Sequence, residues 1–141
     1  MSRICWDTML FIYLLEDHPV FGPRVRHLLD RSYRRGDSLY TSYLALGEVM
    51  AGAEKSPHPN KTRAVRETIR EMGFSCLPFD EGAVVPFGRL RSRERLKVAD
   101  AIHLACAASA GMDLFLTGDG LLAKLDVPGI QFIADFKTPV L

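Results

Sequence analysis

Short apolar runs alternate along this chain with longer segments in which apolar and charged residues are mixed. Each apolar run is only a few residues long, which is typical of strands that are buried on both faces. We therefore expect strands at Arg3–Trp6, Leu39–Thr41, Phe74–Phe79 (cut short by Pro78), Asp113–Leu116 and Ile130–Ile133, followed by an irregular tail at Ala134–Leu141.

The mixed segments have the composition and the boundary residues of helices. Ser42 suits an N-cap, Gly73 suits a helix end, and Pro86 is expected to bend or interrupt its helix. We expect helices at Met9–Glu16, Arg24–Arg34, Tyr43–Ala53, Lys61–Met72, from a capping Asp80 to about Arg95, from just before Asp100 to Gly111, and a short one at Gly120–Leu125.

Strands that alternate with helices form βα units, and such units build a parallel sheet that helices cover on both faces. The chain contains no internal repeat, no low-complexity segment and no second domain. The expected fold class is therefore α/β, a three-layer α/β/α fold with a central, mostly parallel sheet of four to five strands. Residues 1–141 are expected to form this single domain.

The segment Leu96–Asp119 is expected to bring two carboxylates to one edge of the sheet. Its helix of about 12 residues rises roughly 18 Å, and the following strand of about five residues returns roughly 17 Å. The chain thus goes out and comes back by nearly the same distance. Asp100, in the first turn of the helix, and Asp119, in the turn that follows the strand, should end at the same edge.

Two further acids are expected there. Asp7 directly follows the first strand, and Glu48 lies in the second turn of the helix after the second strand. The carboxyl ends of parallel strands meet at one edge, where ligands bind. Taken singly, an Asp at a helix start is usually an N-cap or a partner of the helix dipole. Asp100 and Glu48 have apolar sequence neighbours, where an unpaired acid is costly, and are harder to explain in this way.

The four acids together indicate a metal site. Two like charges about 4 Å apart repel each other by roughly 4 kcal/mol at an effective dielectric constant near 20, so the cluster has no structural benefit. A divalent cation offsets the repulsion, and an all-oxygen ligand set favours Mg²⁺ or Mn²⁺ over zinc. The pattern predicts metal-assisted phosphodiester hydrolysis, with catalytic and metal-binding roles for Asp7, Glu48, Asp100 and Asp119.

Composition and charge narrow the choice of protein class. The chain has 141 residues, of which 48% are hydrophobic and 25% charged, which suits a folded globular protein. Its net charge of +1 excludes a domain that is basic throughout, although Arg24–Arg35 and Arg89–Lys97 are strongly basic. Each basic stretch is either a solvated helix face or a rim that contacts phosphates.

The cysteines and the lengths of the apolar runs indicate the cellular compartment. Cys5, Cys76 and Cys106 are odd in number, have apolar neighbours and lack zinc spacing, so we expect buried free thiols in a reducing compartment. No apolar run approaches the length of a membrane helix, and the apolar start Thr8–Leu15 is too short for a signal peptide. We expect a cytoplasmic protein with no membrane partner.

Four blocks of sequence occur in an order that is typical of one family: ICWDTMLFIYLLE, TSYLALGEVMAG, LKVADAIHLACAASAG and FLTGDGLLAKL. With these blocks the chain resembles the PIN-domain ribonucleases, and most closely the VapC-type toxins of bacterial and archaeal toxin–antitoxin pairs. The resemblance implies a PIN-like fold and a Mg²⁺- or Mn²⁺-dependent endoribonuclease whose acids match Asp7, Glu48, Asp100 and Asp119. In such proteins the acid at Asp119 often contributes less directly, and Thr117 matches a hydroxyl that hydrogen-bonds the acidic site.

The resemblance also implies partners. It predicts an RNA substrate, a homodimer and a cognate antitoxin whose tail lies across the apolar early helices and often places a basic residue in the acidic site. The apolar density of Met9–Leu15 is consistent with such a groove, although the plainer interpretation is core, with only part of the stripe forming a groove. His103 could approach the acids but is better explained as a packed helix residue. Lys97 and Arg95 are candidates for phosphate contacts or for a solvated basic face.

One departure from the family pattern leaves a second hypothesis open. The residues after the first acid are usually Thr-Asn or Ser-Asn, whereas Met9 stands here in place of the Asn. The loss of a hydrogen bond behind the acids would fit a catalytically degenerate module that binds RNA or protein. Two other α/β classes fit poorly. An aspartyl phosphatase usually has a second Asp where Met9 stands, and a response-regulator receiver has a paired acid where Cys5-Trp6 stands.

Overall fold

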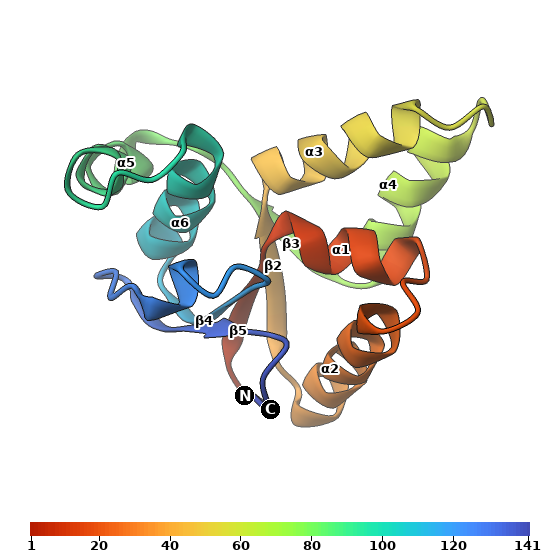
Figure 1. Ribbon diagram of the computed structural model, residues 1–141, viewed down its shortest axis with the longest axis horizontal. Helices are drawn as coiled ribbons and strands as arrows, with labels where there is room; N and C mark the ends of the chain where they lie inside the picture. The colour runs from red at the N-terminus through yellow and green to blue at the C-terminus, as the bar shows by residue number, and fades with distance from the viewer.

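A five-stranded parallel sheet forms the centre of the computed structural model, which describes residues 1–141 (Figure 1). The strands lie in the order β3-β2-β1-β4-β5, and each neighbouring pair is parallel. Their bounds are β1 (Arg3–Trp6), β2 (Ser38–Ser42), β3 (Phe74–Leu77), β4 (Met112–Thr117) and β5 (Ile130–Asp135). The predicted α/β fold with a central parallel sheet is confirmed.

The first strand lies in the middle of the sheet because it pairs on both sides. Ile4 lies opposite Leu39 of β2 and opposite Leu114 of β4. Ile4, Cys5 and Trp6 are buried, which explains the unbroken apolar run in the sequence. The strand order turns at β1: β2 and β3 extend the sheet to one side, and β4 and β5 extend it to the other. Such a switch point leaves a crevice at the carboxyl ends of the central strands, where ligands bind in open α/β sheets.

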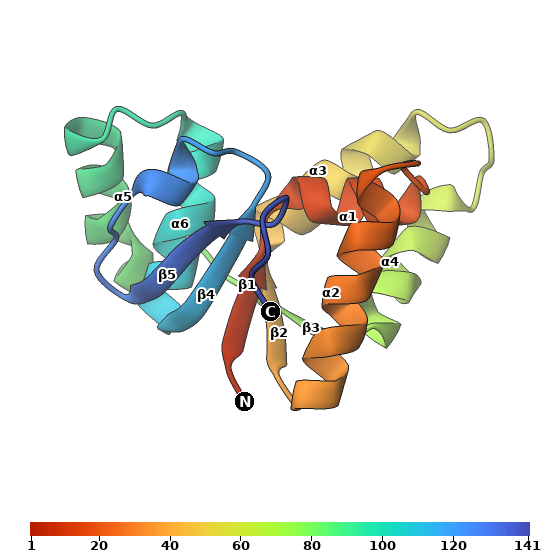
Figure 2. The ribbon, with the colours of Figure 1, turned by 60° about the horizontal axis from the view of Figure 1, so that its bottom comes forward.

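Helices cover both faces of this sheet. Figure 2 shows α1 to α4 on one side of the sheet and α5 and α6 on the other. The helices are α1 (Thr8–Leu15), α2 (Phe21–Arg35), α3 (Tyr43–Glu54), α4 (Lys61–Glu71), α5 (Glu81–Arg93) and α6 (Val98–Ala110), with a 3₁₀ turn η1 (Leu122–Lys124) before β5. The three-layer arrangement that the sequence predicts is therefore present.

Each face of the sheet has its own hydrophobic core. On the side of α1 to α4, the rings of Trp6, Phe11 and Phe74 lie 4.7–5.1 Å apart in tilted or edge-on arrangements. Aromatic pairs of this kind contribute about 0.5–1.5 kcal/mol each beyond the area that they bury. On the other side, the small residues of α6, such as Ala101 and Ala105, are fully buried. Small side chains let α6 lie close to both α5 and the sheet.

Several predicted boundaries need correction. Helix α2 begins at Phe21 rather than Arg24, because Pro23 is accommodated within its first turn. Asp80 occupies the N-cap position of α5, but its side chain accepts no capping hydrogen bond. Only Leu122–Lys124 of the expected helix at Gly120–Leu125 is helical, as a 3₁₀ turn. The last strand continues to Asp135, because β5 pairs with β4 along its whole length.

Cys5 and Cys106 are buried free thiols as predicted, whereas Cys76 is only half-buried. None of the helices combines the length and the apolar character that crossing a lipid bilayer would require.

Candidate functional site: an acidic cavity at the switch point

Asp7 lies where β1 ends and α1 begins. Its backbone N–H still pairs with β4, donating to the Leu116 carbonyl at 2.9 Å, and its extended backbone makes it the N-cap of α1. One carboxylate oxygen, Oδ1, accepts the Thr8 N–H at 2.8 Å, and the other, Oδ2, accepts the Thr117 hydroxyl at 2.8 Å. The side chain is only 14% exposed. Asp7 is therefore an N-cap and also a fixed, largely buried carboxylate.

Thr117, the last residue of β4, connects two of the acids. Its side chain is fully buried, its hydroxyl donates to Asp7, and its oxygen accepts the Asp119 N–H at 3.1 Å. The hydrogen bond to the acidic site that the resemblance implied for Thr117 is present. Asp119 is exposed and caps the next turn, since its Oδ1 accepts the Leu121 N–H at 2.8 Å.

Glu48 reaches the same place from α3. Its Oε1 accepts the Thr8 hydroxyl at 2.7 Å and lies 2.8 Å from His103 Nε2. The Glu48 side chain is 39% exposed, so its apolar sequence neighbours do not bury it fully. His103 is buried, as predicted for a packed histidine, but it also approaches the acids. His103 is therefore packed, as predicted, and also lies close to the acids, which was the alternative that the sequence left open.

Asp100 lies in the first turn of α6 and is half-buried. Burial raises the pKa of its carboxyl above the ordinary value, and the negative charge of Asp7 raises this pKa further. Asp119 adds to the increase in the pKa, while His103 and Lys97 reduce it. These influences show that charges from separate parts of the chain act on Asp100.

A single cavity of about 670 Å³ is lined by all four acids, Asp7, Glu48, Asp100 and Asp119. The out-and-back geometry of α6 and β4 thus brings Asp100 and Asp119 to the edge where β1 ends. Lys97 and Lys55 also line the cavity, whereas Arg95, the other predicted phosphate contact, does not.

The sequence matches the family model for the PIN domain over residues 4–128. The chain belongs to the PIN domain family. No curated protein sequence matches it.

Solved structures with a similar fold come from toxin–antitoxin systems. A chain of VapBC2 from Rickettsia felis, bound to a promoter DNA fragment, aligns with a TM-score of 0.77 and 14% identity over 94% of this chain and 98% of its own. DNA-bound VapBC from Salmonella typhimurium aligns with a TM-score of 0.74 and 24% identity over 96% and 99%. VapBC-5 from Mycobacterium tuberculosis gives 0.66 and 22% over 96% and 99%. At these identities the likeness establishes the PIN-like fold.

The donor set of this PIN domain suits a hard divalent cation. The acids offer oxygen ligands, which Mg²⁺ and Mn²⁺ prefer, and no thiolate faces the cavity. No three His, Cys, Asp or Glu side chains lie close enough together to form a metal cage. Mg²⁺ keeps several waters and usually takes one or two carboxylates, so it needs no such cage. The assignment of all four acids as metal ligands stays a prediction.

The sequence did not single out Thr8 or Lys55, and it marked Ser42 only as an N-cap and His103 chiefly as a packed helix residue. Ser42 accepts the Ala45 N–H at 3.0 Å, which confirms it as the N-cap of α3, and it also contacts His103. The spacing of three residues between Asp100 and His103 places both on one side of α6 and was the available signal. No comparable signal marks Thr8 or Lys55.

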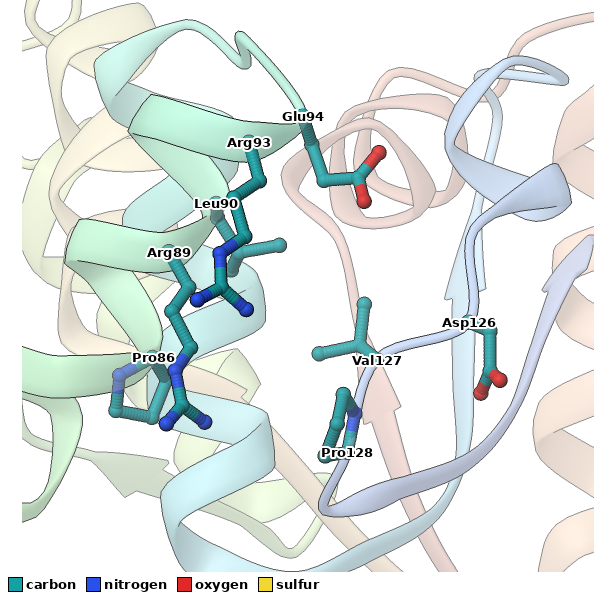
Figure 3. A pocket seen from close by; sticks show the side chains of 8 residues that line it. All are labelled: Pro86, Arg89, Leu90, Arg93, Glu94, Asp126, Val127 and Pro128. Carbon is teal, nitrogen blue, oxygen red and sulfur yellow. The ribbon is translucent and has the colours of Figure 1, made fainter.

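A second, smaller hollow of about 200 Å³ lies between α5 and the loop that leads into β5. Figure 3 shows the guanidinium groups of Arg89 and Arg93 one above the other along α5, on the side that faces Val127 and Pro128. The carboxylate of Asp126 points away from them. Neither arginine forms an ion pair or a hydrogen bond within the chain, so both positive charges are available to a ligand.

Proposed function

We propose that this PIN domain is a Mg²⁺- or Mn²⁺-dependent endoribonuclease and the toxin of a toxin–antitoxin pair. The proposal rests on one observation: four acids from four separate segments line one cavity at the switch point of a PIN-like sheet. The raised pKa of Asp100, caused by burial and then by the charges of Asp7 and Asp119, supports it, because shifted pKa values are common at functional sites.

Asp7, Glu48, Asp100 and Asp119 would hold the metal ion, one or two of them directly and the others through its bound waters. A bound Mg²⁺ or Mn²⁺ activates water and stabilises the leaving oxygen in phosphodiester hydrolysis. Thr117 keeps the Asp7 carboxylate oriented, and Lys55 and Lys97, which line the cavity, would attract the RNA phosphate with their positive charges.

The test is cleavage of a structured RNA by the purified protein. With Mn²⁺ present we expect internal cuts, and with a chelator we expect none. If the protein binds Mn²⁺ saturably by calorimetry but never cuts RNA, or binds no metal at all, the nuclease proposal is wrong. The degenerate binding module then becomes the better explanation, and Met9, which lines the cavity and cannot make the hydrogen bonds of an Asn side chain, is the residue that would account for it.

An antitoxin partner is supported by the surface next to the acids. A groove of about 470 Å³ lies between α1, α3 and α4, with Ile12, Leu15, Val49 and Val65 among its lining residues. It adjoins the acidic cavity, since Ile12 and Lys55 line both. An amphipathic antitoxin segment would find there an apolar groove that leads to the acids. A homodimer and a reducing cytoplasm, the latter fitting three free cysteines, complete the proposal.

Thr117→Val is expected to lower RNA cleavage by about 10- to 100-fold, the usual effect of losing a partner that orients a metal ligand. Valine keeps the shape but leaves the Asp119 N–H and Asp7 Oδ2 without their partner. The free energy of unfolding should fall by about 1–3 kcal/mol, as for other buried groups that lose a hydrogen bond. Cleavage rates and urea denaturation measure both effects. Thr117→Ser, which retains the hydroxyl, should stay close to the parent, and equal losses in the two variants would contradict the assigned role.

The double variant Arg89→Gln/Arg93→Gln is expected to weaken RNA binding, because the hollow in Figure 3 presents two unpaired guanidinium groups. Each lost phosphate contact should reduce the slope of log K against log salt by about 0.7–0.9. Binding is measured by fluorescence anisotropy over a salt series. Arg66→Gln/Arg70→Gln on α4 is the matched control, with the same spacing and the same loss of charge on the opposite side of the sheet. Equal effects of the two pairs would show that only net charge matters.

A further inference from the structure

A buried chain of hydrogen bonds ends on Glu48. Ser42 Oγ lies 2.7 Å from His103 Nδ1, and His103 Nε2 lies 2.8 Å from Glu48 Oε1. Ser42 is 1% exposed and His103 is 4% exposed, so water competes little with either contact. The three residues come from the end of β2, from α6 and from α3.

The direction of these hydrogen bonds follows from the N-cap of α3. Ser42 Oγ already accepts the Ala45 N–H at 3.0 Å, so its own hydroxyl proton remains to be donated. The acceptor within reach is His103 Nδ1. In a neutral imidazole one nitrogen accepts while the other carries the proton. His103 therefore carries its proton on Nε2 and donates it to Glu48 Oε1.

We propose that His103 is a positioning residue, set in its Nε2–H tautomer by Ser42, that holds the Glu48 carboxylate for the metal-dependent nuclease site. Thr8 and His103 both donate to Oε1, while no protein group donates to Oε2. The second oxygen is thus left for a ligand in the cavity that Glu48 lines. Because Glu48 is partly exposed, its side chain would otherwise sample several rotamers, and the two donors remove that freedom.

The role of His103 in metal binding rests on the proposed nuclease function, whereas its tautomer and its contact with Glu48 do not. The tautomer and the contact with Glu48 can be tested in the metal-free protein. A histidine that only fills space in the core needs neither a fixed tautomer nor a coupling to Glu48.

The first measurement is the ¹⁵N–¹H spectrum of the histidine rings at about pH 8, where an ordinary imidazole is neutral. We expect His103 to show the Nε2–H tautomer in the parent protein. Glu48→Gln should shift its Nε2 signal, whereas Glu54→Gln, the same change near the far end of α3, should not. An Nδ1–H tautomer, or equal shifts in both variants, overturns the proposal.

The second measurement compares two amides at position 103 by calorimetry with Mn²⁺. A Gln amide nitrogen can take the place of Nε2 and reach Glu48, whereas an Asn amide can take only the place of Nδ1, beside Ser42. His103→Gln should therefore bind Mn²⁺ nearly as the parent does, and His103→Asn should bind about 10-fold or more weakly. Equal affinities of the two variants overturn the proposal. If the parent binds no Mn²⁺ and cuts no RNA, the nuclease function fails, and the ring spectra alone decide whether His103 positions Glu48.

Discussion

Asp100→Asn is expected to reduce RNA cleavage in Mn²⁺ by more than about 100-fold. Loss of a partner that merely orients a metal ligand already costs about 10- to 100-fold, so loss of a ligand itself should cost more. An amide keeps the shape of the side chain but lacks the charge that attracts a divalent cation. Cleavage of a labelled RNA measures the effect, and Asp30→Asn, at an exposed position of α2, is the control for the substitution itself.

The same substitution should leave stability unchanged or raise it. Burial and the charges of Asp7 and Asp119 raise the pKa of Asp100 in the folded, metal-free protein. When the pKa of an acid is higher in the folded than in the unfolded state, the free energy of unfolding falls as the pH rises from the unfolded to the folded pKa. The ionised form of Asp100 therefore destabilises the fold at neutral pH. The neutral Asn side chain removes this destabilisation. Urea denaturation without metal measures the change in the free energy of unfolding. An Asp100→Asn variant that cuts RNA as the parent does would show that the site is assigned wrongly, and one that unfolds more easily would show that Asp100 is structural.

Gly129→Ala is expected to lower the free energy of unfolding by about 2–5 kcal/mol, the sum of left-handed backbone strain and overpacking. Gly129 has a φ of 99°, and an added Cβ would lie 2.4 Å from the Ala108 carbonyl oxygen at the end of α6. The carbonyl belongs to the backbone and cannot rotate away, so β5 and α6 would have to move apart.

Gly36→Ala is the matched control for this prediction. Gly36 also has a left-handed φ, 73°, but an added Cβ would meet nothing within 4 Å. Its loss should be limited to the backbone strain of about 1–2 kcal/mol. Urea denaturation of both variants separates the two contributions. Equal losses would mean that the close approach of Gly129 to α6 has no energetic consequence.

The acids could be found from sequence because their positions follow from local rules. Asp7 comes directly after one apolar strand and Asp119 two residues after another, and a parallel sheet must bring those strand ends to one edge. Asp100 follows from the matched lengths of a helix and a strand. The structure places all three, with Glu48, around one cavity. The role of each acid toward a metal remains a prediction, which Asp100→Asn tests for Asp100.

The hydrogen-bond partners of these acids could not be found in the same way. Thr8 and His103 meet Glu48, and Ser42 meets His103, only because α1, the end of β2, α6 and α3 pack together, and each residue has an ordinary local explanation. Packing also decides that Glu48 is partly exposed and that Arg89 and Arg93 share a hollow while Arg95 stays outside the cavity. The local sequence around a residue does not indicate which residues from distant segments contact it.

By itself the sequence determined the βα alternation, the parallel sheet and the edge at which Asp7, Glu48, Asp100 and Asp119 meet. Hydrophobic period and strand direction are properties of short segments, and they fix which end of each element an acid occupies. Only the tertiary structure decided which atoms touch: the Thr117 hydroxyl on Asp7, and His103 between Ser42 and Glu48. Hydrogen bonds form only when the elements that carry them lie at the right distance, to within about an ångström. The packing of both hydrophobic cores sets those distances.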